Sequence, residues 1–85
     1  MEFEWDDEKS ATVKSERGAS FEELAEAATG GGLLGYTDNP RRNGEKMLIV
    51  LLKGKVWAVV TEKRKERFRF VTAYQSSKWS KKYGL

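Results

Sequence analysis

Two arginines in the second half of the chain have the spacing of a phosphate-binding pair. Arg67 and Arg69 alternate with Phe68 and Phe70, and successive side chains of a β-strand point to opposite faces, so both guanidinium groups are expected on one face. Guanidinium groups bind phosphate oxygens through paired N–H donors. The alternative is that both are solvated charges on an exposed sheet.

The charges of the chain are sorted by position, which extends this first observation. Residues 1–38 contain ten Asp or Glu against three Lys or Arg, whereas residues 39–85 contain thirteen Lys or Arg against three Asp or Glu. The net charge of +3 therefore combines halves of −7 and +10. A basic half of this kind attracts polyanions such as nucleic acids.

The chain contains neither His nor Cys, which excludes several common chemistries. Ordinary serine and cysteine triads need these residues, and so do most zinc sites. The acidic clusters have the pattern of a helix start and a helix face, so no metal or other cofactor is expected. Without cysteines a reduced cytoplasm is the expected location. We expect no membrane association, because the longest apolar run is residues 47–52.

Helix signals dominate the first part of the chain. Residues 1–5 alternate polar and apolar, which predicts a short strand or extended arm with Phe3 and Trp5 facing inward. Asp6 is expected to cap a helix that ends near Ser15. Residues 20–23 have the sequence of a capping box and begin a second helix, whose apolar stripe should lie on a sheet. Glycines 30–32 end it.

The second part of the chain has the pattern of strands. We expect strands over residues 33–37, 46–52, 55–61 and 66–72, with turns at 53–54 and 62–65 and a last helical turn or docked tail over 73–85. Thr72 is expected to share a face with Phe68 and Phe70. The prediction is one α+β domain, residues 1–85, with two N-terminal helices packed on a three- to four-stranded antiparallel sheet. Arg67 and Arg69 would lie on the open face.

Five segments follow the order and spacing of the BrnT family of toxins, which the chain resembles over nearly its whole length. They are Phe3-Glu4-Trp5-Asp6-Asp7-Glu8-Lys9, Arg17-Gly18-Ala19-Ser20-Phe21-Glu22-Glu23, Gly44-Glu45-Lys46, Val59-Val60-Thr61 and Arg67-Phe68-Arg69-Phe70-Val71-Thr72-Ala73. The resemblance implies a RelE-like fold, a metal-independent ribonuclease that arrests translation, and a cognate ribbon-helix-helix antitoxin. The family usually has Lys-His-Gly where this chain has Glu16-Arg17-Gly18.

Metal-free cleavage of RNA requires a base, an acid and cations that stabilise the added negative charge on phosphorus. We expect Arg67 and Arg69 to bind the phosphate and Tyr74 to join the proton transfers, because surrounding cations lower the pKa of a tyrosine. The resemblance adds Lys9 to the catalytic set. The alternatives are a surface role for the Tyr74 ring and an ordinary ion pair for Lys9.

Further contacts with RNA are expected from the basic loops and the C-terminal segment. The residues concerned are Arg17, Arg41, Arg42, Lys78, Trp79, Lys81 and Lys82. Trp79 lies among lysines and serines and could stack on a base. Arg17 stands where the family has its histidine, although it could simply cap the preceding helix. The loop arginines could also serve only for electrostatic steering or solubility.

Three functions are therefore compatible with the sequence. The first is a ribonuclease toxin whose partners are RNA and a ribbon-helix-helix antitoxin. The second is a non-catalytic RNA-binding or regulatory module of the same fold, which the missing histidine favours. The third is a protein-interaction subunit whose basic face meets an acidic partner.

Overall fold

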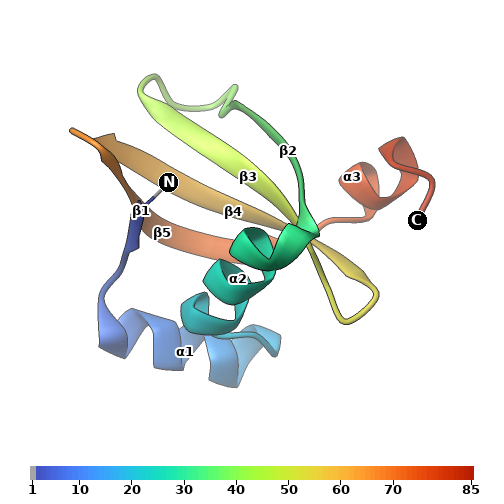
Figure 1. The fold of residues 1–85 in the computed structure, drawn as a ribbon, viewed down its shortest axis with the longest axis horizontal. Helices are drawn as coiled ribbons and strands as arrows, with labels where there is room; N and C mark the ends of the chain where they lie inside the picture. The colour runs from blue at the N-terminus through green and yellow to red at the C-terminus, as the bar shows by residue number, and fades with distance from the viewer. Residues whose placement is uncertain (1) are drawn as a thin grey trace.

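A five-stranded sheet with the strand order β1-β5-β4-β3-β2 forms the body of the protein. The computed structural model describes residues 2–85 (Figure 1). The elements are β1 (Glu2–Glu4), α1 (Asp7–Arg17), α2 (Phe21–Ala27), the π-turn η1 (Ala28–Gly32), β2 (Leu33–Asp38), β3 (Glu45–Leu52), β4 (Lys55–Arg64), β5 (Arg67–Gln75) and α3 (Ser77–Lys82). The predicted α+β class is confirmed. Within the described residues, no helix is long and apolar enough to cross a membrane.

The sheet has one strand more than predicted, and it is mixed. The N-terminal arm forms β1 and pairs in parallel with β5, whereas the other neighbouring strands are antiparallel. Packing of aromatic rings accounts for this position, because the ring centroids of Phe3 and Trp5 lie 5.0 Å and 5.6 Å from that of Phe70. The arm is thereby held against the edge of β5.

The helices begin where their caps predict. The Asp6 carboxylate accepts hydrogen bonds from two backbone N–H groups of the first turn of α1, and Ser20 and Glu23 form the complete capping box of α2. α1 continues two residues beyond the predicted end at Ser15, because Gly18, at a φ of 101°, closes the helix in the left-handed conformation.

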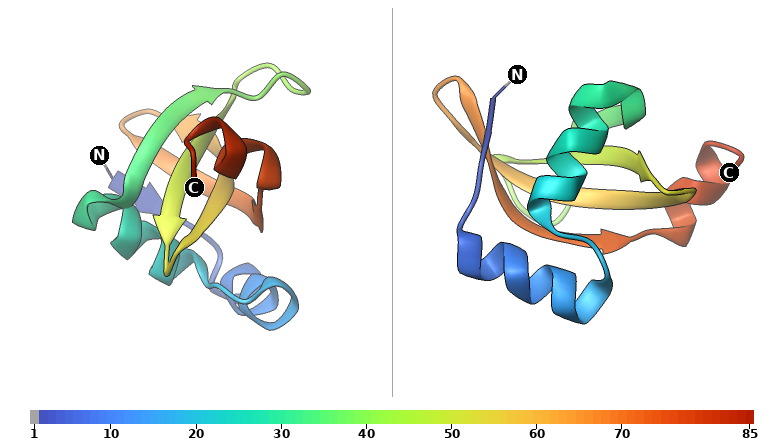
Figure 2. Two further views of the ribbon diagram at one scale, coloured as in Figure 1. Left: turned by 90° about the vertical axis from the view of Figure 1, so that its right-hand side faces the viewer. Right: turned by 60° about the horizontal axis from the view of Figure 1, so that its bottom comes forward.

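The two faces of the sheet are buried by different elements. α1 and α2 cover one face, and Phe21 and Leu24 are fully buried there against β3 and β4. Figure 2 shows α2 lying across the sheet with α1 beside it. The opposite face carries a second apolar cluster, against which Trp79 of α3 packs. The C-terminal segment, predicted as a last helical turn or a docked tail, thus forms the short helix α3 and packs on this face, so the face expected to be open is partly covered.

A β-bulge in β5 changes which side chains share a face. Val60 pairs with Thr72, but the next residue of β4, Thr61, pairs with Phe70, so Val71 is an extra residue. The prediction that Thr72 shares a face with Phe70 is wrong for this reason. The bulge also places Tyr74 on the face opposite to Phe70, which strict alternation along the strand would not allow.

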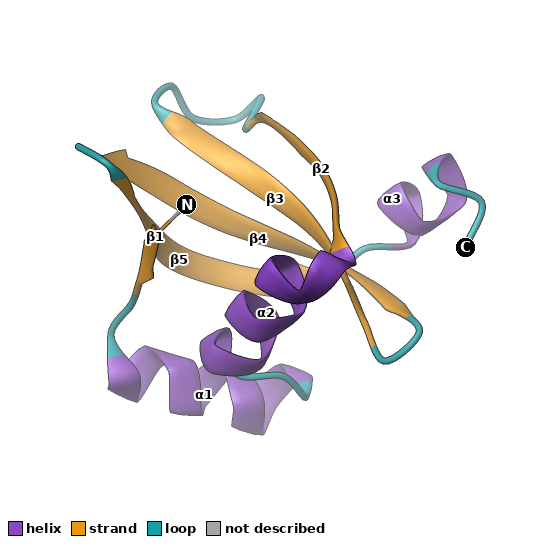
Figure 3. Ribbon diagram, viewed as in Figure 1, coloured by secondary structure: helices purple, strands orange, loops and turns teal. Residues whose placement is uncertain are grey.

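The two β-hairpins that join β3, β4 and β5 differ in how well the sequence predicted them. The turn at Lys53 and Gly54 has φ angles of 50° and 78°, as a tight two-residue hairpin turn requires. β4 extends to Arg64, so the second turn lies at residues 65–66, later than the predicted 62–65. Figure 3 shows that the longest loop, residues 39–44, joins β2 to β3.

Candidate functional site

A cleft of about 690 Å³ lies on the face of the sheet opposite to α2. Its floor is apolar and is formed by Met47, Val60 and Val71 of the three central strands. Its rim comes from four separate segments, which are the first turn of α1, the loop between β2 and β3, the end of β5 and the start of α3. The bulge residue of β5, Val71, is thus part of the floor.

The cleft brings together six of the eleven residues that the sequence singled out. These are Lys9, Arg41, Arg42, Tyr74, Lys78 and Trp79. They are separated by up to 70 positions in the chain. Only the tertiary fold, with α1 beside β5 and α3 on the face opposite to α2, places them around one hollow.

Three of these residues are cations without a carboxylate partner in the part of the chain that the structure describes. Lys9 belongs to α1, Arg41 to the loop between β2 and β3, and Lys78 to α3, and none of them forms an ion pair within residues 2–85. All three are exposed. Their positive charges are therefore free to bind an anion in the cleft.

The loop that carries Arg41 is held by a buried carboxylate at the start of β3. The side chain of Asn39 donates to Glu45 Oε1 at 2.9 Å, and its backbone N–H donates to the Glu45 carbonyl at 3.0 Å. Arg41 N–H donates to Asn39 Oδ1 at 3.0 Å. Glu45 Oε2 lies 3.7 Å from Arg42 Nη1. Only 7% of Glu45 is exposed, although it lines the cleft.

Glu45 did not stand out in the sequence as a functional residue. It belongs to a segment of the family resemblance, but its charge alone suggested nothing about its position. Its alternation with Met47 and Ile49 was the available signal, because residues 45, 47 and 49 share one face of β3 and the latter two are buried apolar residues.

The two aromatic residues at the cleft differ in how available their side chains are to a ligand. Tyr74 is 38% exposed, and its hydroxyl donates weakly to Met47 Sδ at 3.9 Å. The Trp79 ring stacks on Tyr83 with the centroids 6.2 Å apart, and Lys82 Nζ lies 4.8 Å from its centroid. Tyr74 is thus available to a ligand, whereas Trp79 already packs within α3.

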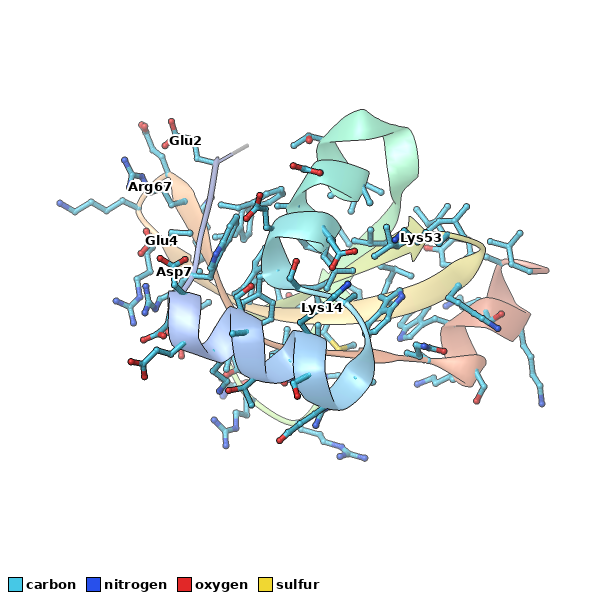
Figure 4. The ribbon with its side chains drawn as sticks, turned by 90° about the horizontal axis from the view of Figure 1, so that it is seen from below. Glu2, Glu4, Asp7, Lys14, Lys53 and Arg67 are labelled. Atoms are coloured by element: carbon cyan, nitrogen blue, oxygen red, sulfur yellow. The ribbon has the colours of Figure 1, made fainter. Side chains whose placement is uncertain are left out.

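Arg67 and Arg69 lie outside the cleft, although they share a face as predicted. Glu2 and Glu4 of β1 stand opposite them in the register, and each arginine is 3.1 Å from the carboxylate beside it. Figure 4 shows Glu2, Glu4 and Arg67 at the same end of the sheet. Arg69 lines a smaller hollow of about 540 Å³, which Lys9 also borders.

The remaining predicted contacts are not part of the cleft wall. Arg17 Nη1 donates to the Ala73 carbonyl at 2.8 Å and to Thr72 Oγ1 at 3.4 Å. It therefore satisfies a backbone carbonyl at the edge of β5. Lys81 and Lys82 are exposed residues of α3.

The comparison with known proteins gives no family. No protein-family model and no curated protein sequence matches the chain. Among residues 2–85, no group of three or more carboxylates is placed to hold a metal ion. What is established is an α+β fold with N-terminal helices on a five-stranded, mostly antiparallel sheet.

Proposed function

We propose that the protein is a metal-independent ribonuclease toxin of BrnT type with a RelE-like fold, which cleaves RNA and is restrained by a ribbon-helix-helix antitoxin. One observation carries the proposal. Three cations from three different elements, Lys9, Arg41 and Lys78, meet at one cleft without carboxylate partners among residues 2–85.

The chemistry of the cleft suits a flexible, single-stranded polyanion. The rim cations bind phosphates, and the apolar floor offers contact area to ribose and base. Tyr74 stands among these cations, where proton transfer and phosphate binding can occur together. Hydrogen-bond donors around a bound phosphate stabilise it most strongly in the transition state, where additional negative charge develops.

Arg67 and Arg69 remain candidates for phosphate binding despite their ion pairs. Exposed pairs of this kind contribute about 0–1 kcal/mol, and the Arg67 and Glu2 side chains are each more than half exposed. RNA phosphates can therefore compete with Glu2 for the Arg67 guanidinium group, whereas the Arg69–Glu4 pair is only about one-third exposed and is harder to displace. We expect these arginines to extend the path of the RNA beyond the cleft, past Lys9 and along β5.

Removal of the three rim cations tests the proposal. A purified triple variant is compared with wild type for cleavage of a single-stranded RNA in EDTA; its substitutions are Lys9→Gln, Arg41→Gln and Lys78→Gln. We expect the rate of cleavage to fall by at least about 100-fold. The slope of log Kobs for RNA binding against log salt concentration should become shallower by about 2, since each phosphate contact to a single strand contributes about 0.7.

The matched control removes the same charge elsewhere. Lys55, Lys63 and Lys65 lie in β4 and its following turn, outside the cleft, and form no ion pair within the described residues. Their replacement by Gln should leave cleavage within a few-fold of wild type. Equal losses in both triple variants would show that net charge, and not the cleft, determines activity.

The second candidate is a non-catalytic RNA-binding module, which the absence of histidine from the chain favours. The same assay separates the two functions. A salt-sensitive gel shift without any cleavage, in EDTA or with added divalent cations, would support the binding module. Cleavage that persists in EDTA would exclude it.

The proposed antitoxin must cover the cleft or the strand beside it to prevent RNA binding. Because the rim is cationic, the covering segment should carry an acidic face. Complex formation should then slow and weaken as salt rises, since exposed charges are screened over a Debye length of about 8–10 Å. A complex equally stable at low and near-molar salt would show that apolar surface holds the partner instead.

A further inference from the structure

Glu45 is the one charged residue that is buried in the part of the chain that the structure describes. A carboxylate removed from water is unfavourable unless hydrogen bonds or cations compensate for the lost hydration. Asn39 supplies one hydrogen bond at 2.9 Å, and Arg42 is 3.7 Å away with most of its side chain in solvent.

The free capacity of this carboxylate faces the cleft. A carboxylate has about four lone-pair positions, and the side-chain bond from Asn39 uses one of them at Oε1. The loop itself does not depend wholly on the carboxylate, because the Asn39 N–H also donates to the Glu45 backbone carbonyl.

Glu45 is also the cleft residue that is suited to accept a proton at neutral pH. The other proton-exchanging side chains on the cleft wall are lysine and tyrosine, which ordinarily hold their protons at pH 7, whereas a carboxyl group has lost its own. Lysine and tyrosine can serve as the acid. They cannot serve as the base without first losing a proton.

We propose that Glu45 is the general base of the cleft and Tyr74 its general acid, an inference that rests on the proposed ribonuclease function. Glu45 Oε2 takes the proton of an RNA 2′-hydroxyl, and the bond from O2′ to phosphorus forms as the bond from phosphorus to O5′ breaks. Tyr74 gives its proton to the departing O5′. The products are a 2′,3′-cyclic phosphate and a 5′-hydroxyl, and water returns the proton from Glu45 to Tyr74.

Among the charged and titratable groups around Glu45, one second carboxylate can serve as a control for the loss of negative charge. Arg42 lies 3.7 Å from Glu45, and the same cleft is lined by Lys9, Arg41, Tyr74 and Lys78. Glu62 stands directly opposite Glu45 on β4. Glu62 is more exposed, pairs with Arg64 at 3.1 Å and does not line the cleft. Glu62→Gln therefore removes a carboxylate from the same face of the sheet without removing the proposed base.

The test compares Glu45→Gln and Glu62→Gln on a single-stranded RNA oligonucleotide in EDTA. The glutamine at position 45 keeps an oxygen that can accept from Asn39, so the loop should be retained. We expect Glu45→Gln to cleave at least about 100-fold more slowly while it binds RNA as tightly as wild type. Glu62→Gln should cleave within a few-fold of wild type.

A second variant keeps the inference falsifiable if Glu45→Gln folds poorly. Glu45→Asp keeps a carboxylate on a shorter side chain, so it should cleave RNA more slowly than wild type while it still binds RNA as tightly; a Glu45→Asp variant that binds RNA but does not cleave it at all would overturn the assignment. If wild type and Glu45→Gln cleave RNA at similar rates, Glu45 is not the base, although the proposed ribonuclease function stands. The same holds if Glu45→Gln loses RNA binding in parallel with cleavage. No cleavage by wild type overturns the proposed function as well.

Discussion

Replacement of Glu23 by Gln should destabilise the fold measurably, because this one carboxylate joins three segments. Its oxygens lie 2.6 Å from Lys14 Nζ of α1 and 3.6 Å from Lys53 Nζ of the β3–β4 turn, and they accept from the Ser20 N–H at 3.1 Å. Figure 4 labels both lysines. The contacts with Lys14 and Ser20 lower the pKa of Glu23 from 4.5 to about 2, with the hydrogen bond from Lys14 as the largest cause.

The magnitude follows from the pKa and the exposure of the partners. At about 1.4 kcal/mol per unit of pKa, the lowered value corresponds to an upper limit of about 3.5 kcal/mol. Half of the Lys14 side chain is exposed and Lys53 more so, so solvent screening reduces this figure. We expect a loss of about 1.5 kcal/mol, which lowers the Tm of a domain of this size by about 6–12 °C.

The stabilisation of the fold by Glu23 should decrease as the pH falls. The pKa of Glu23 in the folded state is below its ordinary value of 4.5, so its contribution is complete above about pH 4.5 and is lost as pH falls toward 2. The difference in free energy of unfolding between wild type and Glu23→Gln should therefore be constant near neutral pH and vanish near pH 2.

Urea unfolding from pH 2 to pH 7 measures this difference. Glu26→Gln is the matched control, since Glu26 is an exposed residue of the same helix with no ion pair among the described residues. A Glu23→Gln variant as stable as Glu26→Gln at pH 7 would refute the reasoning, and so would a stability difference that does not decline in acid.

Three further predictions concern packing and charge. Gly32→Ala should destabilise by more than 1 kcal/mol in urea unfolding, because a Cβ there would stand 2.6 Å from a carbonyl oxygen of β3; an unchanged midpoint would contradict this. Gly35→Ala should displace the Tyr83 hydroxyl, which a Cβ would meet, and hydrogen exchange should show faster opening of α3. Glu2→Gln with Glu4→Gln should strengthen RNA binding and steepen its salt dependence, whereas loss of affinity would exclude a phosphate-binding role for the arginines of β5.

Features that depend on neighbours in the sequence were predicted well. The Asp6 cap, the capping box at Ser20 and Glu23, and the turn at residues 53–54 are each determined within a few residues. The alternation that places Arg67 and Arg69 on one face is local in the same sense. No bulge separates these two residues, so the alternation holds between them.

Features that depend on distant pairing were missed. The bulge at Val71 arises from the register between β4 and β5, and nothing in the segment itself signals it. The ion pairs of Arg67 and Arg69 depend on the parallel pairing of β1, whose partner lies about 65 positions away in the chain. Arg41 was predicted as an RNA contact, but its convergence with Lys9 and Lys78 follows from the tertiary fold.

The pairing of β1 with β5 also determines the order in which the molecule can be completed. During synthesis, Phe3 and Trp5 leave the ribosome about 65 residues before the strand β5 and the Phe70 ring against which they pack. The two rings therefore stay exposed on the nascent chain until β5 has been made, a delay that is typical of proteins with many long-range contacts. The cleft is completed equally late, because Lys9 and Lys78 come from opposite ends of the chain. Any activity of the cleft thus begins only after nearly the whole domain has been translated.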